Sequence, residues 1–335
     1  MRKPLLILVC MFAACAMSLD YAWSQDIHFS QMDVSAMSSS WARIGDYQGD
    51  GSVTIANRSQ WRSVSGVPYQ TQFIQGEMKS FKNRLHWGGS VHHDKAGDGV
   101  WRQTQLSMGV GYQCWSDTNK FNLILAMAAS WMQWTWNPEL LTWGNQWDGF
   151  QWNEAAGSGE YFATQSQHAA CHAGIDFRLR WNERWRTQCS WGGFNIISSN
   201  VDMGLSRYNW YPRSVFQQTT RFTIHPKNNL SLQSVWMIQK PSQSKMIWLK
   251  DQIIMDERDW NFWGINVGLG ARSLDAVVMQ VGGFFRQHEV GFAYDVNHSD
   301  LMAATQGRGA WEMYYRWIWR KPRILAKKEI CPEYY

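Results

Sequence analysis

Long stretches of this chain alternate apolar and polar residues with a period of two. In 311–319, aromatic and other apolar residues occupy the odd positions, whereas Glu312, Tyr314 and Arg316 lie between them. The same alternation runs through 81–88, 171–181 and 289–297. Because successive side chains of a β-strand point to opposite faces, the pattern predicts strands with one apolar and one polar face. An all-β fold follows.

The alternation and the turn signals between its stretches divide the chain into about fourteen strands. We expect antiparallel strands near 51–62, 66–78, 80–92, 102–115, 120–133, 168–181, 186–199, 215–224, 229–239, 245–255, 261–272, 276–286, 289–298 and 310–319.

Composition bears on which face of these strands meets water. Only 18% of the 335 residues are charged, whereas 23 are Trp, 12 Tyr and 15 Phe. Such a chain suits a transmembrane barrel with a wet interior and an apolar outer face, and its aromatic residues would form belts at the membrane interfaces. A soluble β-sandwich would use the same alternation with the faces reversed. The net charge of +5 gives no strong signature of nucleic-acid binding.

The lengths of the expected connections favour the barrel. The short ones are 116–119, 182–185, 225–228 and 287–288, and the long ones are 93–101, 134–167, 200–214 and 299–309. With both termini in the periplasm, every long connection falls on the external side and the shortest ones on the internal side. Outer-membrane barrels show this asymmetry, and a sandwich has no reason to sort its loops in this way.

The two ends of the chain predict export and a periplasmic tail. Residues 1–24 are typical of a secretory signal, with a basic start, a short apolar stretch and cleavage before Gln25. A lipoprotein signal, with Cys15 as the lipidated residue, is the alternative. We expect 25–50 to form an N-terminal periplasmic segment, 51–319 the barrel and 320–335 a basic periplasmic tail. The location is the outer membrane.

Two groups of residues are candidates for function. Charged residues predicted to line the lumen are Lys82, Arg84, Asp176, Arg178, Arg180, Glu312 and Arg316. They would either line a pore or pair and fill a plugged lumen. Aromatic residues of the long external loop are Trp136, Trp143, Trp147 and Trp152, which would fold over the barrel mouth or stack on a sugar or a partner.

No motif for catalysis or cofactor binding is present. The chain lacks a nucleophile elbow, a phosphate-binding loop and a dinucleotide fingerprint. We therefore predict no catalytic residue, no cofactor and no metal site, and a protein that is not an enzyme. Which of Cys114, Cys171, Cys189 and Cys331 pair stays open.

Several sequence blocks resemble a known family. They are Gln25-Asp26-Ile27-His28-Phe29-Ser30-Gln31, Asn57-Arg58-Ser59-Gln60-Trp61, Phe292-Ala293-Tyr294-Asp295-Val296-Asn297 and the ending Cys331-Pro332. In order and spacing they resemble the PorP/SprF outer-membrane proteins of the type IX secretion system. The resemblance implies a non-enzymatic barrel that works with secretion components and supports secretion or surface attachment of cargo such as large adhesins, in bacteria some of which glide.

Three other functions remain as alternatives at this point. A diffusion porin would use the same barrel and set its ion selectivity with the lumen charges. A barrel-embedded hydrolase would need a reactive serine. A secreted β-sandwich would bind glycans through its Trp residues.

Overall fold

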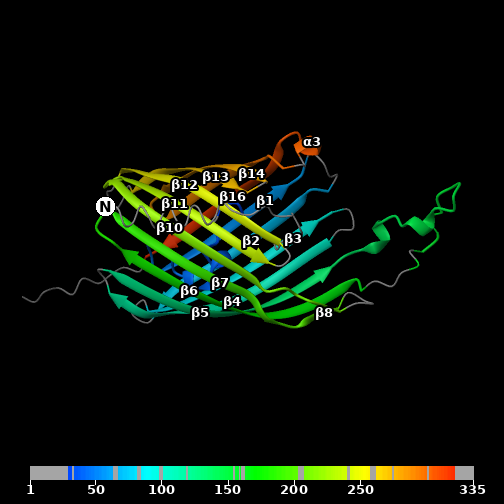
Figure 1. Cartoon of the computed structure of the whole chain (residues 1–335), viewed down its shortest axis with the longest axis horizontal. Coiled ribbons are helices and arrows are strands. Elements are labelled where there is room, and N and C mark those ends of the chain that lie inside the picture. Colours follow the sequence, from blue (N-terminus) through cyan, green and yellow to red (C-terminus); the bar gives the residue numbers. More distant parts are fainter. Residues whose placement is uncertain are drawn as a thin grey trace, which may run out of the picture.

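Fourteen antiparallel strands close into a barrel in the computed structural model of this chain (Figure 1). The structure describes residues 29–31, 34–62, 67–80, 84–97, 101–117, 120–153, 155–157, 159, 163–202, 207–239, 242–256, 262–273, 275–299 and 302–320. First and last strands pair along their whole length, from Gly51 opposite Trp319 to Gln60 opposite Ala310. The closed sheet therefore has no free edge, as the interior of a lipid bilayer requires.

The barrel strands follow one another around the wall, and neighbours in the sequence pair as hairpins except where β8 and β9 intervene. They are β1 (Gly51–Gln60), β2 (Tyr69–Ser80), β3 (Leu85–Ala96), β4 (Trp101–Asp117), β5 (Phe121–Thr135), β6 (Gln165–Arg180), β7 (Trp185–Ser198), β10 (Arg213–His225), β11 (Asn228–Gln239), β12 (Ser242–Asp256), β13 (Trp263–Arg272), β14 (Ala276–Phe285), β15 (His288–Asn297) and β16 (Arg308–Trp319).

The predicted number of barrel strands is confirmed, and their bounds differ from the expected ones by a few residues. Between β7 and β10 the structure adds a small separate hairpin of β8 (Asn200–Asp202) and β9 (Arg207–Asn209). The expected loop 93–101 is shorter in the structure, because β3 continues to Ala96. No helix among the described residues is long and apolar enough to cross a membrane.

Apolar side chains cover the outside of the wall, and polar side chains point into the lumen. On β16, Met313 is 57% exposed, whereas its neighbour Glu312 is 1% exposed. The same holds on β2, where Ile74 is exposed and Gln75 is buried. A soluble protein buries its apolar face, so this wall is inverted and suits contact with lipid acyl chains. The stacked-sheet alternative is wrong, and the lipid-facing barrel is confirmed.

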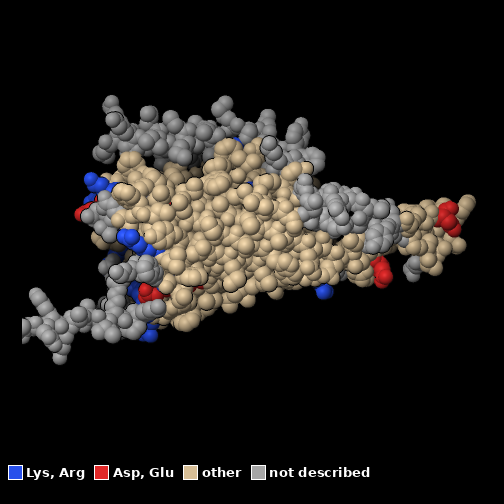
Figure 2. All heavy atoms as spheres, turned by 90° about the horizontal axis from the view of Figure 1, so that it is seen from below, with Lys and Arg blue, Asp and Glu red and all other residues tan. Residues whose placement is uncertain are grey.

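Aromatic side chains lie near both ends of the strands, on the outer face. Exposed examples at one end are Trp115, Trp181, Trp185, Trp263 and Trp317. Trp131 and Trp236 lie near the other end. Aromatic belts at these levels mark the two membrane–water interfaces. On the face drawn in Figure 2, the wall between the two ends is almost free of charge.

The two ends of the barrel differ in the length of their connections. One end carries 136–164, 199–212 and 298–307, and we name it the long-loop end. The other carries 118–120, 181–184, 226–227 and 286–287, and we name it the short-turn end. The connection 240–241 is a two-residue exception at the long-loop end. Most of the long connections therefore lie at one end of the barrel and most of the short ones at the other, as expected. Two features of this barrel are candidates for function: its lumen and its longest loop.

Candidate functional site

The described residues that precede β1 lie inside the barrel. Residues 29–31 and 34–50, which we name the plug, bury apolar side chains such as Phe29, Met37 and Trp41 against inward-facing residues of the wall. This differs from the expectation of a separate periplasmic segment over 25–50. The physical reason is that the polar lumen offers partners for a polar, serine-rich segment, which gains more contacts there than in water.

Serine side chains cap the two short helical turns that fold the plug into a compact shape. Ser35 Oγ accepts the backbone N–H of Ser38 at 3.2 Å and begins α2 (Ala36–Ser39). Ser40 Oγ accepts the backbone N–H of Ala42 at 3.3 Å and begins the 3₁₀ turn η1 (Trp41–Arg43). Such caps satisfy backbone donors that a helix leaves unpaired at its start.

Glycines on the inner wall leave room for the plug. A Cβ atom added at Gly109 would lie 2.5 Å from the Trp41 ring, and one at Gly192 would lie 2.2 Å from the carbonyl oxygen of Ser39. Gly174 lies directly opposite Gly192 in the neighbouring strand, and a Cβ atom added there would lie 2.7 Å from the backbone nitrogen of Ala42 in η1. No larger residue fits these places without moving the plug or the wall, so the wall is shaped to receive it.

Glu312 holds the first residues of the plug. Its carboxylate accepts the backbone N–H of Ser30 at 2.6 Å and that of Gln31 at 2.9 Å. The same carboxylate forms an ion pair with Arg58 on β1. All of these groups are buried. Because a buried carboxylate is costly unless it is paired and hydrogen-bonded, the plug and Arg58 together stabilise Glu312 as an anion.

Asp295 joins the same cluster from β15. Its carboxylate lies 3.1 Å from Arg58 and 3.0 Å from Arg272, and it accepts the hydroxyl of Ser30 at 2.8 Å. Two arginines and two carboxylates therefore surround Ser30, and four strands of the wall contribute them. The cluster connects the plug to β1, β13, β15 and β16.

A second ionic network holds the last part of the plug. Asp46 lies 2.8 Å from Arg43 and 3.5 Å from Arg178, which in turn pairs with Asp176 at 2.6 Å. Gln188 donates to both carboxylates at 3.0 Å. Burial opposes ionisation of Asp46, but the charges of Arg178 and Arg43 outweigh it and lower the pKa of its carboxyl below the ordinary value.

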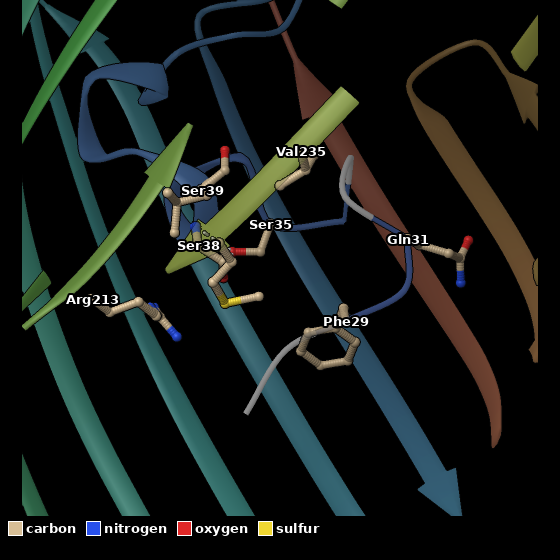
Figure 3. Close-up of a pocket in the computed structure, with 9 residues that line it drawn as sticks. Phe29, Gln31, Ser35, Ser38, Ser39, Arg213 and Val235 are labelled. Carbon is tan, nitrogen blue, oxygen red and sulfur yellow. Dashed lines mark hydrogen bonds between the residues drawn. The ribbon is translucent and has the colours of Figure 1, made fainter. Parts of the chain in front are cut away.

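Further contacts place the plug against other strands. Glu77 on β2 accepts the backbone N–H of Gly45 at 2.7 Å, and Arg316 on β16 donates to the carbonyl of Val34 at 3.3 Å. A small cavity between the plug and β10–β11 is lined by residues that include Ser38, Arg213 and Val235 (Figure 3). Since the plug touches strands on all sides, it crosses the lumen.

The lumen-lining candidates fall into three groups. Asp176, Arg178, Glu312 and Arg316 point into the lumen and belong to the networks that hold the plug. Arg84 and Arg180 are exposed at the short-turn end. Lys82 lies outside the described residues. Sequence reasoning missed Arg58 and Glu77, whose inward position the alternation of β1 and β2 could have indicated in part, and Asp46, which precedes the barrel strands.

The longest loop projects from the barrel beyond the long-loop end (Figure 1). We name residues 136–164 the extension. At its base Trp136 Nε1 donates to the carbonyl of Ala163 at 2.7 Å, and Trp143 Nε1 donates to the carbonyl of Pro138 at 3.2 Å. The first part of the extension contains two 3₁₀ turns, η2 (Pro138–Leu140) and η3 (Gly144–Gln146).

The tip of the extension is a tight turn with exposed aromatic residues. Trp147 and Trp152 form a β-bridge with ring centroids 6.4 Å apart. Asp148 accepts the backbone N–H groups of Phe150 and Gln151, each at 2.8 Å, and these bonds lower the pKa of its carboxyl. Phe150 is 93% exposed and Trp147 is 51% exposed. An ordered turn that displays large apolar side chains to solvent marks a candidate binding surface.

Thiols and metal ligands add no further site among the described residues. Cys114, Cys171 and Cys189 are free thiols, and Cys331 lies outside the described residues. In the described part of the chain, no three His, Cys, Asp or Glu side chains gather in a way that could hold a metal ion.

The chain is similar to one protein family and to several solved outer-membrane barrels. The family described as "Type IX secretion system membrane protein PorP/SprF" matches residues 23–317. Among solved structures, the CymD monoaromatic hydrocarbon channel is 9% identical with a TM-score of 0.46 over 84% of this chain and 91% of that chain. The Pseudomonas putida toluene transporter TodX is 7% identical with a TM-score of 0.47 over 90% and 95%. The KdgM porin is 7% identical with a TM-score of 0.38 over 80% and 99%. No curated protein matches the chain.

Proposed function

Because the chain belongs to the PorP/SprF family of type IX secretion system membrane proteins, we propose that it supports secretion or surface anchoring of cargo, such as large adhesins, as a barrel component of that system. The observation that carries this proposal beyond family membership is the filled lumen. A barrel whose interior is occupied by its own ordered segment is suited to presenting surfaces to partners at its two ends.

In this proposal the barrel lies in the outer membrane with its long-loop end outside the cell. Outer-membrane barrels place short turns in the periplasm and longer loops outside, and the expected signal over 1–24 would bring the chain there. The extension would then meet cargo or an anchored adhesin. The short turns and the tail 320–335 would meet the secretion machinery.

Association with the secretion system is tested by affinity purification from the outer membrane in mild detergent. We expect other components of the type IX system to accompany the tagged chain and to be absent from a matched preparation of an unrelated outer-membrane barrel. Finding the same proteins in both preparations would remove the proposed role.

The proposed role of the tail has its own test. A chain without 321–335 should still assemble in the outer membrane, as judged by heat-modifiable migration on gels, while displaying less adhesin on the cell surface. Unchanged display would show that the tail is not needed, without affecting the role proposed for the barrel.

The diffusion porin is the main competing function, and the plug disfavours it. The plug contacts β13, β15 and β16 as well as strands from β1 to β11, so an open aqueous path would require it to move. Planar-bilayer recordings discriminate between the two. We expect the full chain to show no steady open channel, whereas a porin would conduct continuously.

We also propose that the chain has no catalytic role. A barrel hydrolase would carry an activated serine, and a serine-reactive fluorescent probe would label it in the native outer membrane. We expect no labelling above that of heat-denatured protein, and specific labelling would favour the enzyme.

A further inference from the structure

Cations gather at the short-turn end of the barrel. Figure 2 shows Lys and Arg atoms clustered there, opposite the extension. Exposed members among the described residues are Arg84, Lys120, Arg180, Arg184, Arg186, Arg221, Lys227, Arg286 and Arg320. We name this set the basic mouth. Among the side chains that the structure describes in the turns of this end, which leave out 81–83, 117–119, 256–261 and 321–335, Glu183 is the one exposed carboxylate.

Three of these cations form a ladder of like charges across neighbouring strands. Arg180 on β6 lies directly opposite Arg186 on β7, and Arg186 lies directly opposite Arg221 on β10. Like charges at directly opposite positions destabilise a sheet. None of the three forms a salt bridge within the described part of the chain, although the charge of Arg221 contributes to lowering the pKa of Asp46. The fold therefore keeps an unfavourable arrangement of charge that a bound anion would relieve.

The ladder belongs to the lumen side of the wall. Arg180 has the same parity as Asp176, Arg186 the same parity as Gln188, and Arg221 the same parity as the buried Thr219. Because side chains alternate between faces, these positions point toward the mouth of the lumen.

The lipid-facing side at this level has a different character. Trp185 and Phe222, which pack with ring centroids 4.6 Å apart, occupy the outward positions next to Arg186 and Arg221. Aromatic residues of this kind sit at the headgroup level. The arrangement separates an aromatic surface for lipid from a cationic surface that faces along the barrel axis. Lipid headgroups are thus met by the aromatic residues, and the basic mouth is left for a partner that approaches end-on.

We propose that the basic mouth is a docking surface for an acidic polypeptide segment of a partner protein. Guanidinium groups bind carboxylates in a bidentate geometry, and a row of them across three strands, continued by cations on four further turns, matches a chain of carboxylates better than a single small anion. Placing this partner in the periplasm rests on the proposed function, whereas the charge and position of the surface do not.

Binding of a defined acidic probe tests the proposal. The full chain in neutral detergent micelles would be titrated into a labelled peptide of alternating Glu and Ser, with a Gln–Ser peptide as the uncharged probe, and fluorescence anisotropy would be recorded. We expect binding of the Glu peptide only, and its loss at about 0.5 M salt, where exposed charges are screened beyond a few ångströms.

The variant R180Q/R186Q/R221Q removes the ladder and keeps the side chains long and polar. We expect it to bind the Glu peptide about tenfold more weakly, since three exposed pairs together contribute on the order of 1–2 kcal/mol. The matched control R62Q/R102Q/R308Q removes three exposed arginines from the long-loop end and should bind as the native chain does.

Equal binding by both variants, or equal binding of the Gln peptide, would overturn the proposal. The proposal would also be overturned if R180Q/R186Q/R221Q lost binding to anionic-lipid vesicles but kept its binding to the Glu peptide. That result would assign the surface to lipid. Thermal unfolding of R180Q/R186Q/R221Q provides the check on folding: the lost repulsion offsets the lost attraction between Arg221 and Asp46, so its Tm should stay close to the native value. Copurification of secretion components is independent of this result, so either proposal can fail without the other.

Discussion

The plug and the extension both lie outside the barrel wall, but their side chains differ in burial and in the contacts that they make. Trp41 of the plug is buried against a glycine of the wall, whereas Trp147 of the extension is half exposed. The polar groups of Ser30 and Asp46 meet charges of the barrel. The plug finds its partners within the chain, while the tip of the extension leaves its apolar surface for something outside it.

This difference separates structural residues from interaction residues of the same type. A change in the plug breaks contacts between the plug and several strands of the wall, so it should lower the free energy of unfolding. A change of the Phe150 side chain at the tip of the extension, which is 93% exposed, should act on association and hardly on stability. Four substitutions, from the largest expected effect on stability to the smallest, would test this contrast.

Replacing Glu312 by Ala should destabilise the barrel most. The change leaves the buried Arg58 without its closest carboxylate and the N–H groups of Ser30 and Gln31 without an acceptor. Removing one partner of a buried ion pair costs about 3–5 kcal/mol. Denaturant unfolding in micelles would measure it. Glu183→Ala, at an exposed turn, should change the unfolding free energy by less than about 0.5 kcal/mol, and similar losses for the two would contradict the role of the cluster.

Replacing Gly192 by Ala should displace the plug. The added Cβ atom would approach the carbonyl oxygen of Ser39 to 2.2 Å, so backbone must move. Overpacking of this kind costs about 1–3 kcal/mol. We expect lower stability together with intermittent conductance in planar bilayers. Gly76→Ala is the matched control, because nothing lies within 4 Å of its added Cβ atom. A native-like Gly192→Ala barrel would show that the plug is not seated there.

Replacing Asp46 by Asn should cost about 1–3 kcal/mol, since Arg43 and Arg178 lose the carboxylate charge that both of them contact. The folded pKa of Asp46 is lower than its unfolded value, so its contribution is fully present above the unfolded pKa of about 3.9 and is lost as the pH falls toward the folded pKa. The difference between native chain and variant in thermal unfolding should therefore be constant from pH 8 to about pH 5 and shrink only below about pH 4. A difference that disappears between pH 7 and pH 5 would contradict the pairing.

Replacing Phe150 by Ser should leave stability within about 0.5 kcal/mol of the native value, because the side chain is 93% exposed. If the extension binds cargo, adhesin display on cells should fall. Tyr211→Ser, an exposed aromatic on another loop of the same end, is the matched control and should change neither quantity. Equal display in both variants would remove the tip from the proposed function.

Local patterns predicted the barrel wall well, because the alternation of residues within one strand indicates its apolar and its polar face. The alternation in 311–319 placed Glu312 and Arg316 on the polar face, where the structure finds them. The same alternation could not say whether that face was the inside or the outside of a closed surface. Composition and loop lengths favoured the membrane barrel, and closure of β1 on β16 decided it.

Contacts between distant parts of the chain account for what sequence reasoning missed. Ser30 and Glu312 are 282 positions apart, and Asp46 meets Gln188 across 142. Neither serine-rich turns nor isolated acids in 29–50 carry a pattern that predicts burial. The small residues Gly109, Gly174 and Gly192 on inward faces are the one local signal that something passes close to the wall.

By itself the sequence determined a family, a number of strands and an apolar face for each, because these depend on residues two positions apart or on short blocks. Only the tertiary structure decided that the plug lies in the lumen, and that Arg180, Arg186 and Arg221 lie side by side at one end of the barrel. Both depend on register and closure, which bring together side chains that no local pattern connects.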